Sequence, residues 1–205
     1  RRRVRLLTPL IKFRACRDAR RATGDAMEVR GGVGYTEEWS DSRLLRDAHL
    51  GSIWEGTSNI VALDVLRAIG REQCLEALLP ELNDSIARAP RVLAGRLAAS
   101  LDKAAEFAHE VASSRNEAHA RQAATGLYYA CAAALLADEG TRLGGGAQPD
   151  ARRQLMAFLA YVHRLAPRDP LRRVTGGFEA EFADALLPET PIAPEAAERI
   201  LTRLA

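Results

Sequence analysis

The spacing of apolar and polar residues predicts a long first helix over residues 3–30. Leu6, Leu10 and Phe13 recur every three or four positions, which is the period of one helix face. Small residues continue a stripe at the same period: Ala15, Ala19, Ala22 and Ala26. Because small residues let another backbone approach closely, we expect this stripe to be interior. The arginines between them are expected on the solvent side: Arg14, Arg17, Arg20 and Arg21.

Turn and cap residues divide the region that follows. A glycine-rich run at 31–34 ends the first helix. The polar run 40–42 offers N-caps for a short helix at 43–49, and the polar run 57–59 does the same for a helix that stops at Gly70.

Beyond residue 70 the pattern repeats as helix, short loop, helix. We expect helices at 72–79 (ending before Pro80), 90–113, 116–143, 151–165, 179–187 and 194–204. Turn-forming residues interrupt the chain at 144–150 and around 167–177, and no stretch alternates as a strand would. The sequence predicts an all-α protein, an antiparallel helical bundle with additional C-terminal helices. We divide it into a motif-bearing segment, 1–70, and a helical extension, 71–205.

Composition narrows the possible functions. Ala, Leu and Arg dominate, which favours helices, and a net charge of +2 gives no general signal for polyanion binding. The three cysteines lack the paired spacing of a disulfide framework or a zinc site, so we predict reduced thiols, no metal and a cytoplasmic location. No apolar run is long enough to span a membrane. The basic opening, RRRVRLL, reads as the middle of a helix, so we expect a piece of a longer protein.

Glu55 is the carboxylate that stands out, between Trp54 and Gly56 and just before a predicted helix. As a structural residue it would complement the helix dipole, worth roughly 0.3–1 kcal/mol. As a functional residue it would be a base beside an aromatic ring, shielded from water when a ligand binds. The nearby GGVG does not fit a dinucleotide fingerprint, because Glu37 occupies the third glycine position and a helix precedes it. A turn with unshielded backbone N–H groups remains, and such groups can face a phosphate.

Two runs, AMEVRGGVGYTEEW and RLLRDAHLGSIWEGTSNI, resemble in order and spacing the C-terminal helical domain of the acyl-CoA dehydrogenase family. The resemblance covers about Leu7 to Ile69. It implies FAD as cofactor, an acyl-CoA substrate and a homo-oligomer, a dimer or tetramer. It also implies an N-terminal helical domain and a β domain outside this chain, so we expect the chain alone to be inactive.

The resemblance also assigns roles to individual residues. Glu55 is expected to be the base that removes the α-proton of the acyl thioester while the β-hydrogen leaves as hydride to the flavin. Trp54 is expected to line the acyl pocket, and Arg46 and Asp47 to form a local pair. The expected FAD contacts are Gly31, Gly32, Gly34 and Thr57.

The continuation NIVALDVLRAI, with well over a hundred further residues, is similar to the AidB-like, alkylation-response branch. The C-terminal extension of that branch is associated with DNA binding. Two alternatives to an enzyme domain therefore stay open. One is a DNA-binding flavoprotein that protects against alkylation, and the other is a scaffold for oligomerisation.

Overall fold

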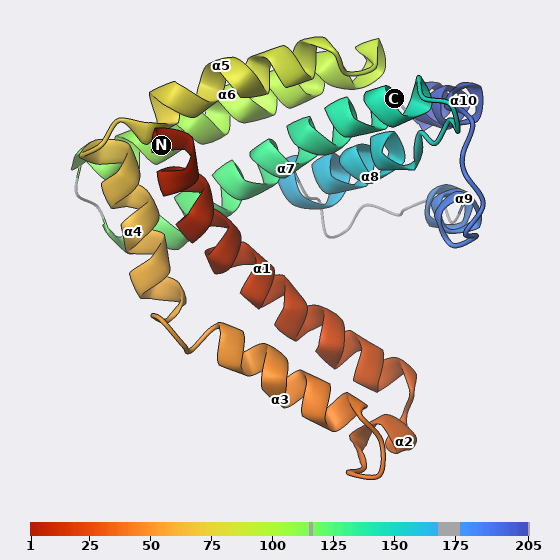
Figure 1. The fold of residues 1–205 in the computed structure, drawn as a ribbon, viewed down its shortest axis with the longest axis horizontal. Helices are drawn as coiled ribbons and strands as arrows, with labels where there is room; N and C mark the ends of the chain where they lie inside the picture. The colour runs from red at the N-terminus through yellow and green to blue at the C-terminus, as the bar shows by residue number, and fades with distance from the viewer. Residues whose placement is uncertain (115–116, 168–176, 205) are drawn as a thin grey trace. The chain divides into compact units, whose positions relative to one another are not determined.

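The computed structural model describes residues 1–114, 117–167 and 177–204, and every regular element in these ranges is helical (Figure 1). The prediction of an all-α fold is confirmed. The chain divides into two compact units. The first unit comprises residues 1–77 and 107–128, and the second comprises residues 78–106 and 129–205. The predicted division at residue 70 stays a prediction.

The first unit is built around α1 (Arg2–Val29), which lies beside α3 (Asp41–Gly51) and α4 (Ser58–Gly70), with the short α2 (Gly32–Tyr35) at its C-terminal end (Figure 1). The predicted helices at 3–30, 43–49 and 60–70 correspond to α1, α3 and α4. The unit also contains the start of α5 (Cys74–Ala87), the end of α6 (Arg91–Ser114), a 3₁₀ turn (Glu117–His119) and the start of α7 (Ala120–Gly144).

The N-terminal half of α1 is fixed to α4 by both burial and charge. Arg5 donates two hydrogen bonds to the Asp64 carboxylate, at 2.9 and 2.8 Å, and a third to Glu72 at 2.8 Å. This bidentate geometry suits the planar guanidinium group. The apolar residues beneath it are at most 8% exposed: Leu6, Leu10, Phe13, Val61, Ala62, Val65, Leu66, Ala68 and Ile69.

The C-terminal half of α1 corrects the prediction about its faces. The alanines expected in the interior are exposed, while Arg14, Arg17 and Arg20 are half-buried. The reason is helical periodicity. Residues 17, 20 and 24 follow Leu6, Leu10 and Phe13 at spacings of three or four, so they lie on the same face of the helix. The face that buries leucines near the N-terminus therefore presents two arginines further along.

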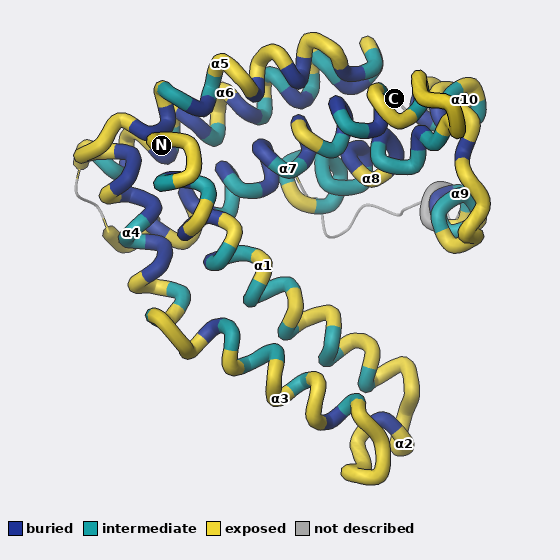
Figure 2. The backbone as a smooth tube through the Cα atoms, viewed as in Figure 1, coloured by how far each residue is buried: buried dark blue, intermediate teal, exposed yellow. Residues whose placement is uncertain are grey.

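The second unit is a packed set of helices formed by parts of α5, α6 and α7 with α8 (Arg152–Ala160), α9 (Gly177–Leu186) and α10 (Pro194–Leu204). Helix α8 ends in a π-helical turn, Tyr161–Leu165, where the sequence predicts continuous helix. Large side chains less than 2% exposed form its core: Leu82, Leu93, Leu97, Leu101, Leu155, Phe158 and Leu201. In Figure 2, dark buried stretches run along α5, α6 and α8.

Helix α5 corrects a second prediction, because it continues through Pro80 to Ala87. Proline inside a helix costs about 3 kcal/mol. The apolar face continues past it, however, and Leu82 and Ile86 are at most 5% exposed. Burying two such side chains contributes roughly 1.5–3 kcal/mol each, which outweighs the proline.

Polar contacts join elements of the second unit that are distant in sequence. Arg88 donates to Asp138 at 2.7 and 3.0 Å, and Ser85 donates to the same carboxylate at 3.4 Å. Arg152 donates to three backbone carbonyl oxygens of the segment before α10, those of Leu186, Pro188 and Thr190. Most of the predicted turn-rich stretch at 167–177 lies outside the described residues. No helix in the described part of the chain is long and apolar enough to cross a membrane.

Candidate functional site

Glu55 lies in the tight turn between α3 and α4 and has a strained backbone. Its φ is +56°, in the left-handed region that side chains with a Cβ avoid, and Gly56 follows with a φ of +110°. Such a conformation costs on the order of 1–3 kcal/mol and is concentrated at functional sites. The two residues reverse the chain so that Thr57 begins α4 as its N-cap residue.

Lys12 of α1 holds this turn in place and is a residue that sequence reasoning missed. Its Nζ lies 3.2 Å from Glu55 Oε2 and also donates to the Trp54 carbonyl oxygen. The signal available in the sequence was that Lys12 is one of two lysines in an arginine-rich chain.

Glu55 and the neighbouring Trp54 are both exposed in this structure. The Glu55 side chain is 75% exposed and Trp54 is 66% exposed. The small gap beneath the turn, lined in part by Lys12, Cys16 and Gly56, holds about 10 Å³, which is too little for a ligand. Any pocket around Glu55 therefore needs a second surface.

The three glycines of the turn after α1 differ in their surroundings. Gly31 has a φ of +63°. Gly31 and Gly32 both border open space, because a Cβ on either would meet nothing within 4 Å. Gly34 is buried, and a Cβ there would lie 2.5 Å from the Met27 carbonyl oxygen. Packing therefore requires the third glycine, while the first two leave a bare backbone that a ligand can approach.

Thr57 is exposed at the N-terminus of α4, and its side chain makes no capping hydrogen bond. Its hydroxyl group and the first N–H groups of α4 thus face outward with the positive end of the helix dipole behind them. This arrangement suits a polar or anionic ligand.

A hollow of about 470 Å³ lies among α1, α2 and α3. Met27, Tyr35 and Leu45 give it an apolar lining. Arg46 donates to Glu37 across this region at 2.6 and 3.0 Å, which lowers the pKa of Glu37. The predicted pairing of Arg46 with Asp47 is therefore wrong as the main contact, because neighbouring side chains on a helix point in different directions.

The structure brings together only some of the predicted site residues. Trp54, Glu55 and Thr57 occupy one turn, whereas the glycines lie at the other end of α3 (Figure 1). A helix of the 11 residues of α3 is roughly 16 Å long. The two motifs of this chain therefore mark two separate surfaces of the first unit.

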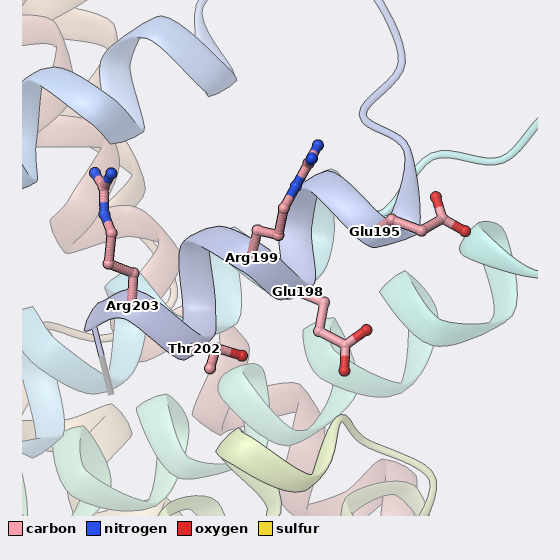
Figure 3. Close-up of a pocket in the computed structure, with 5 residues that line it drawn as sticks. All are labelled: Glu195, Glu198, Arg199, Thr202 and Arg203. Carbon is pink, nitrogen blue, oxygen red and sulfur yellow. The ribbon is translucent and has the colours of Figure 1, made fainter.

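The second unit has a hollow of about 490 Å³ along α10 (Figure 3). All five residues that line it belong to that helix: Glu195, Glu198, Arg199, Thr202 and Arg203. Arg203 also pairs with Glu181 of α9. Charged residues on a single exposed helix face are typical of a solvated surface, and none of the predicted site residues is among them.

Comparison with known proteins identifies the region that carries these motifs. Residues 2–70 match the family described as "Acyl-CoA dehydrogenase, C-terminal domain", which confirms the predicted resemblance. This part of the chain is similar to the C-terminal domain of acyl-CoA dehydrogenases.

Individual relatives match stretches of similar length. The "Putative acyl-CoA dehydrogenase AidB" of Escherichia coli (strain K12) is 45% identical over 78 residues, which are 38% of this chain and 14% of that protein. "Acyl-CoA dehydrogenase family member 11" of Caenorhabditis elegans is 44% identical over 75 residues, 36% of this chain and 12% of that protein. "Short/branched chain specific acyl-CoA dehydrogenase, mitochondrial" of Rattus norvegicus is 38% identical over 63 residues, 31% of this chain and 15% of that protein. The match thus spans less than a sixth of each of these relatives.

Proposed function

We propose that the first unit supplies one wall of the active site of an FAD-dependent acyl-CoA dehydrogenase-like oxidoreductase, with Glu55 as its catalytic base. The observation that carries this proposal is the strained backbone of Glu55. The left-handed turn leaves the Glu55 side chain 75% exposed just before the start of α4. A purely structural helix-start acid needs no such conformation.

The residues present fit FAD as the cofactor. Gly31 and Gly32 offer backbone with no side chain in the way, and Thr57 offers a hydroxyl group and a helix N-terminus for polar groups of the cofactor. FAD, when bound, accepts the hydride that leaves the β-carbon of the acyl chain. The two surfaces are separated by α3, so we propose that they serve FAD molecules of two subunits in a homo-oligomer.

Glu55 would take the proton from the α-carbon of the thioester. Lys12 Nζ lies 3.2 Å from the Glu55 carboxylate, and the fixed turn limits the positions that the carboxylate can reach. Trp54 would cover the acyl chain on one side. Since both side chains are exposed in this unit, the exclusion of water has to come from substrate and from the surfaces of further domains.

The test is Glu55→Gln in the full-length parent protein, with FAD content and acyl-CoA-driven bleaching of the flavin as readouts. Loss of a general base lowers the rate by about 10²–10⁴-fold. Glu38→Gln, an exposed acid in the same segment, is the matched control and should bleach at the wild-type rate. Unchanged bleaching by the Glu55 variant, with FAD bound, would remove Glu55 from this role.

DNA binding remains a second candidate, motivated by the identity with the AidB relative. It predicts duplex binding whose log K falls linearly with log salt concentration. A full-length protein that does not bind duplex DNA at low salt would exclude it. A cytoplasmic location and a pure scaffold role stay predictions.

A further inference from the structure

A group of cations lies where α1 passes the end of α3 and the start of α4, all within the first unit. We call Arg17, Arg20 and Arg121, with the hydroxyl groups of Ser52 and Ser58, the arginine cluster. Arg17 Nη1 donates to Ser58 Oγ at 3.3 Å, and Arg20 Nη1 donates to Ser52 Oγ at 3.4 Å. Arg121 of α7 is close enough to repel Arg17.

The cluster lacks an anion. Within the part of the chain that the structure describes, neither Arg17 nor Arg20 has a carboxylate partner, and the buried Arg20 Nε has no acceptor. The nearest acid, Asp18, is held by Arg14 at 2.5 and 3.1 Å. Among the described residues, the hydrogen bonds of Arg17 and Arg20 thus go to neutral hydroxyl groups, and the Phe13 ring lies 5.9 Å from Arg17. The charge of Asp18 offsets the repulsion at Arg17 only in part, because the pKa of Arg17 remains lowered.

This arrangement is costly without a ligand. Burial lowers the pKa of Arg17, and repulsion from Arg121, Arg14 and Arg20 lowers it further. A buried N–H group without an acceptor also loses its hydration without compensation. A bound anion can neutralise such a group of cations. A guanidinium group suits this role because it donates two parallel N–H hydrogen bonds to an oxyanion.

We propose that the arginine cluster binds a phosphate group, held by Arg17 and Arg20 and by the hydroxyl groups of Ser52 and Ser58. The start of α4 adds the positive end of a helix dipole beside Ser58, and the side chain of Thr57 does not cap that end. None of the side chains of the cluster is proposed for catalysis or FAD binding, although the N-terminus of α4 is shared with the site proposed for FAD. Free phosphate and the phosphate of a nucleotide share this chemistry.

The experiment titrates the purified protein with inorganic phosphate or ADP, in chloride buffer of constant ionic strength, and measures heat of binding and Tm. Saturable binding is expected to weaken at least about tenfold in Arg17→Gln and in Arg20→Gln, since each removes a charge-assisted contact. Arg17→Lys should retain part of the affinity. Arg21→Gln is the matched control, because Arg21 lies on the same helix, is 64% exposed and pairs with Asp25.

The two roles of Arg17 give opposite results in phosphate-free buffer. As part of an anion site, Arg17→Gln relieves repulsion and keeps or raises Tm, while abolishing the rise in Tm that phosphate produces. A purely structural Arg17 predicts a lower Tm and an unchanged response to phosphate. Tighter binding of ADP than of phosphate would assign the site to a nucleotide. No saturable binding of either ligand, or binding of duplex DNA alone, would overturn the proposal.

Discussion

The segment 31–59 and the second unit differ in how they use apolar side chains. The segment exposes about half or more of most of its large ones, including Tyr35, Trp39, Ile53 and Trp54, and buries only Gly34, Ser42 and Ser52. The second unit buries leucines and phenylalanines along almost every described helix (Figure 2). This segment therefore buries less of its own apolar surface than the second unit does.

The difference indicates that the segment 31–59 contacts other surfaces, whereas the side chains of the second unit mainly contact one another. Exposed clusters of aromatic and branched side chains mark interaction surfaces, whereas a continuous core stabilises a unit by itself. The strained turn at Glu55 belongs to the first kind. The second unit, which lies beyond the residues 2–70 matched by the family, carries stability and no proposed chemistry.

The largest expected effect separates the two regions directly. Leu93→Ala in the second unit should lower the free energy of unfolding by about 2–5 kcal/mol, because it leaves a cavity at a residue with no exposure. Ile53→Ala, at a residue 64% exposed, should change it by less than about 0.5 kcal/mol. Denaturant titration of both variants measures this. Equal losses would contradict the comparison.

The Arg88–Asp138 pair should make the second unit sensitive to acid. The hydrogen bonds from Arg88 lower the pKa of Asp138, so this stabilisation is present at neutral pH and is lost as pH falls through the lowered value. Arg88→Ala should destabilise the second unit at pH 7, and less as pH falls through the lowered pKa of Asp138. Arg91→Ala, an exposed residue of α6, is the control. A loss independent of pH would mean that packing, not charge, carries the effect.

Two glycines of the second unit are expected to respond in opposite directions. A Cβ at Gly140 would lie 2.6 Å from the backbone nitrogen of Gln154, so Gly140→Ala should force α7 from α8 and cost about 1–3 kcal/mol. At Gly95 a Cβ meets nothing within 4 Å, so Gly95→Ala should stabilise α6 by about 0.5–1 kcal/mol. Thermal unfolding measures both, and a stabilising Gly140→Ala would show that the two helices are not closely packed.

The smallest expected effect tests whether the segment is a surface for contact. Trp54→Ala should change the stability of the isolated chain by less than about 0.5 kcal/mol. The same substitution should raise KM for acyl-CoA in the full-length parent if Trp54 covers the substrate. A destabilised isolated chain with unchanged KM would assign Trp54 to packing instead.

Periodicity and caps were sufficient to predict the helices from the sequence, because these signals act over three or four residues. The helix at 194–204 agrees residue for residue, and α1 and α6 agree within one residue. Order and spacing of short motifs were likewise sufficient to identify residues 2–70 and to select Glu55 for testing.

Only the tertiary structure decided which face of each helix is covered. The same 3.6-residue period allowed either the alanines or the arginines of α1 to be interior, and packing against α3 and α4 selected Arg17 and Arg20. Long-range contacts also stabilise α5 as a helix that continues past Pro80. They place Lys12 beside Glu55, which is 43 positions away in the sequence. Such contacts depend on the summed burial and charge of several helices, and no local window of sequence contains that sum.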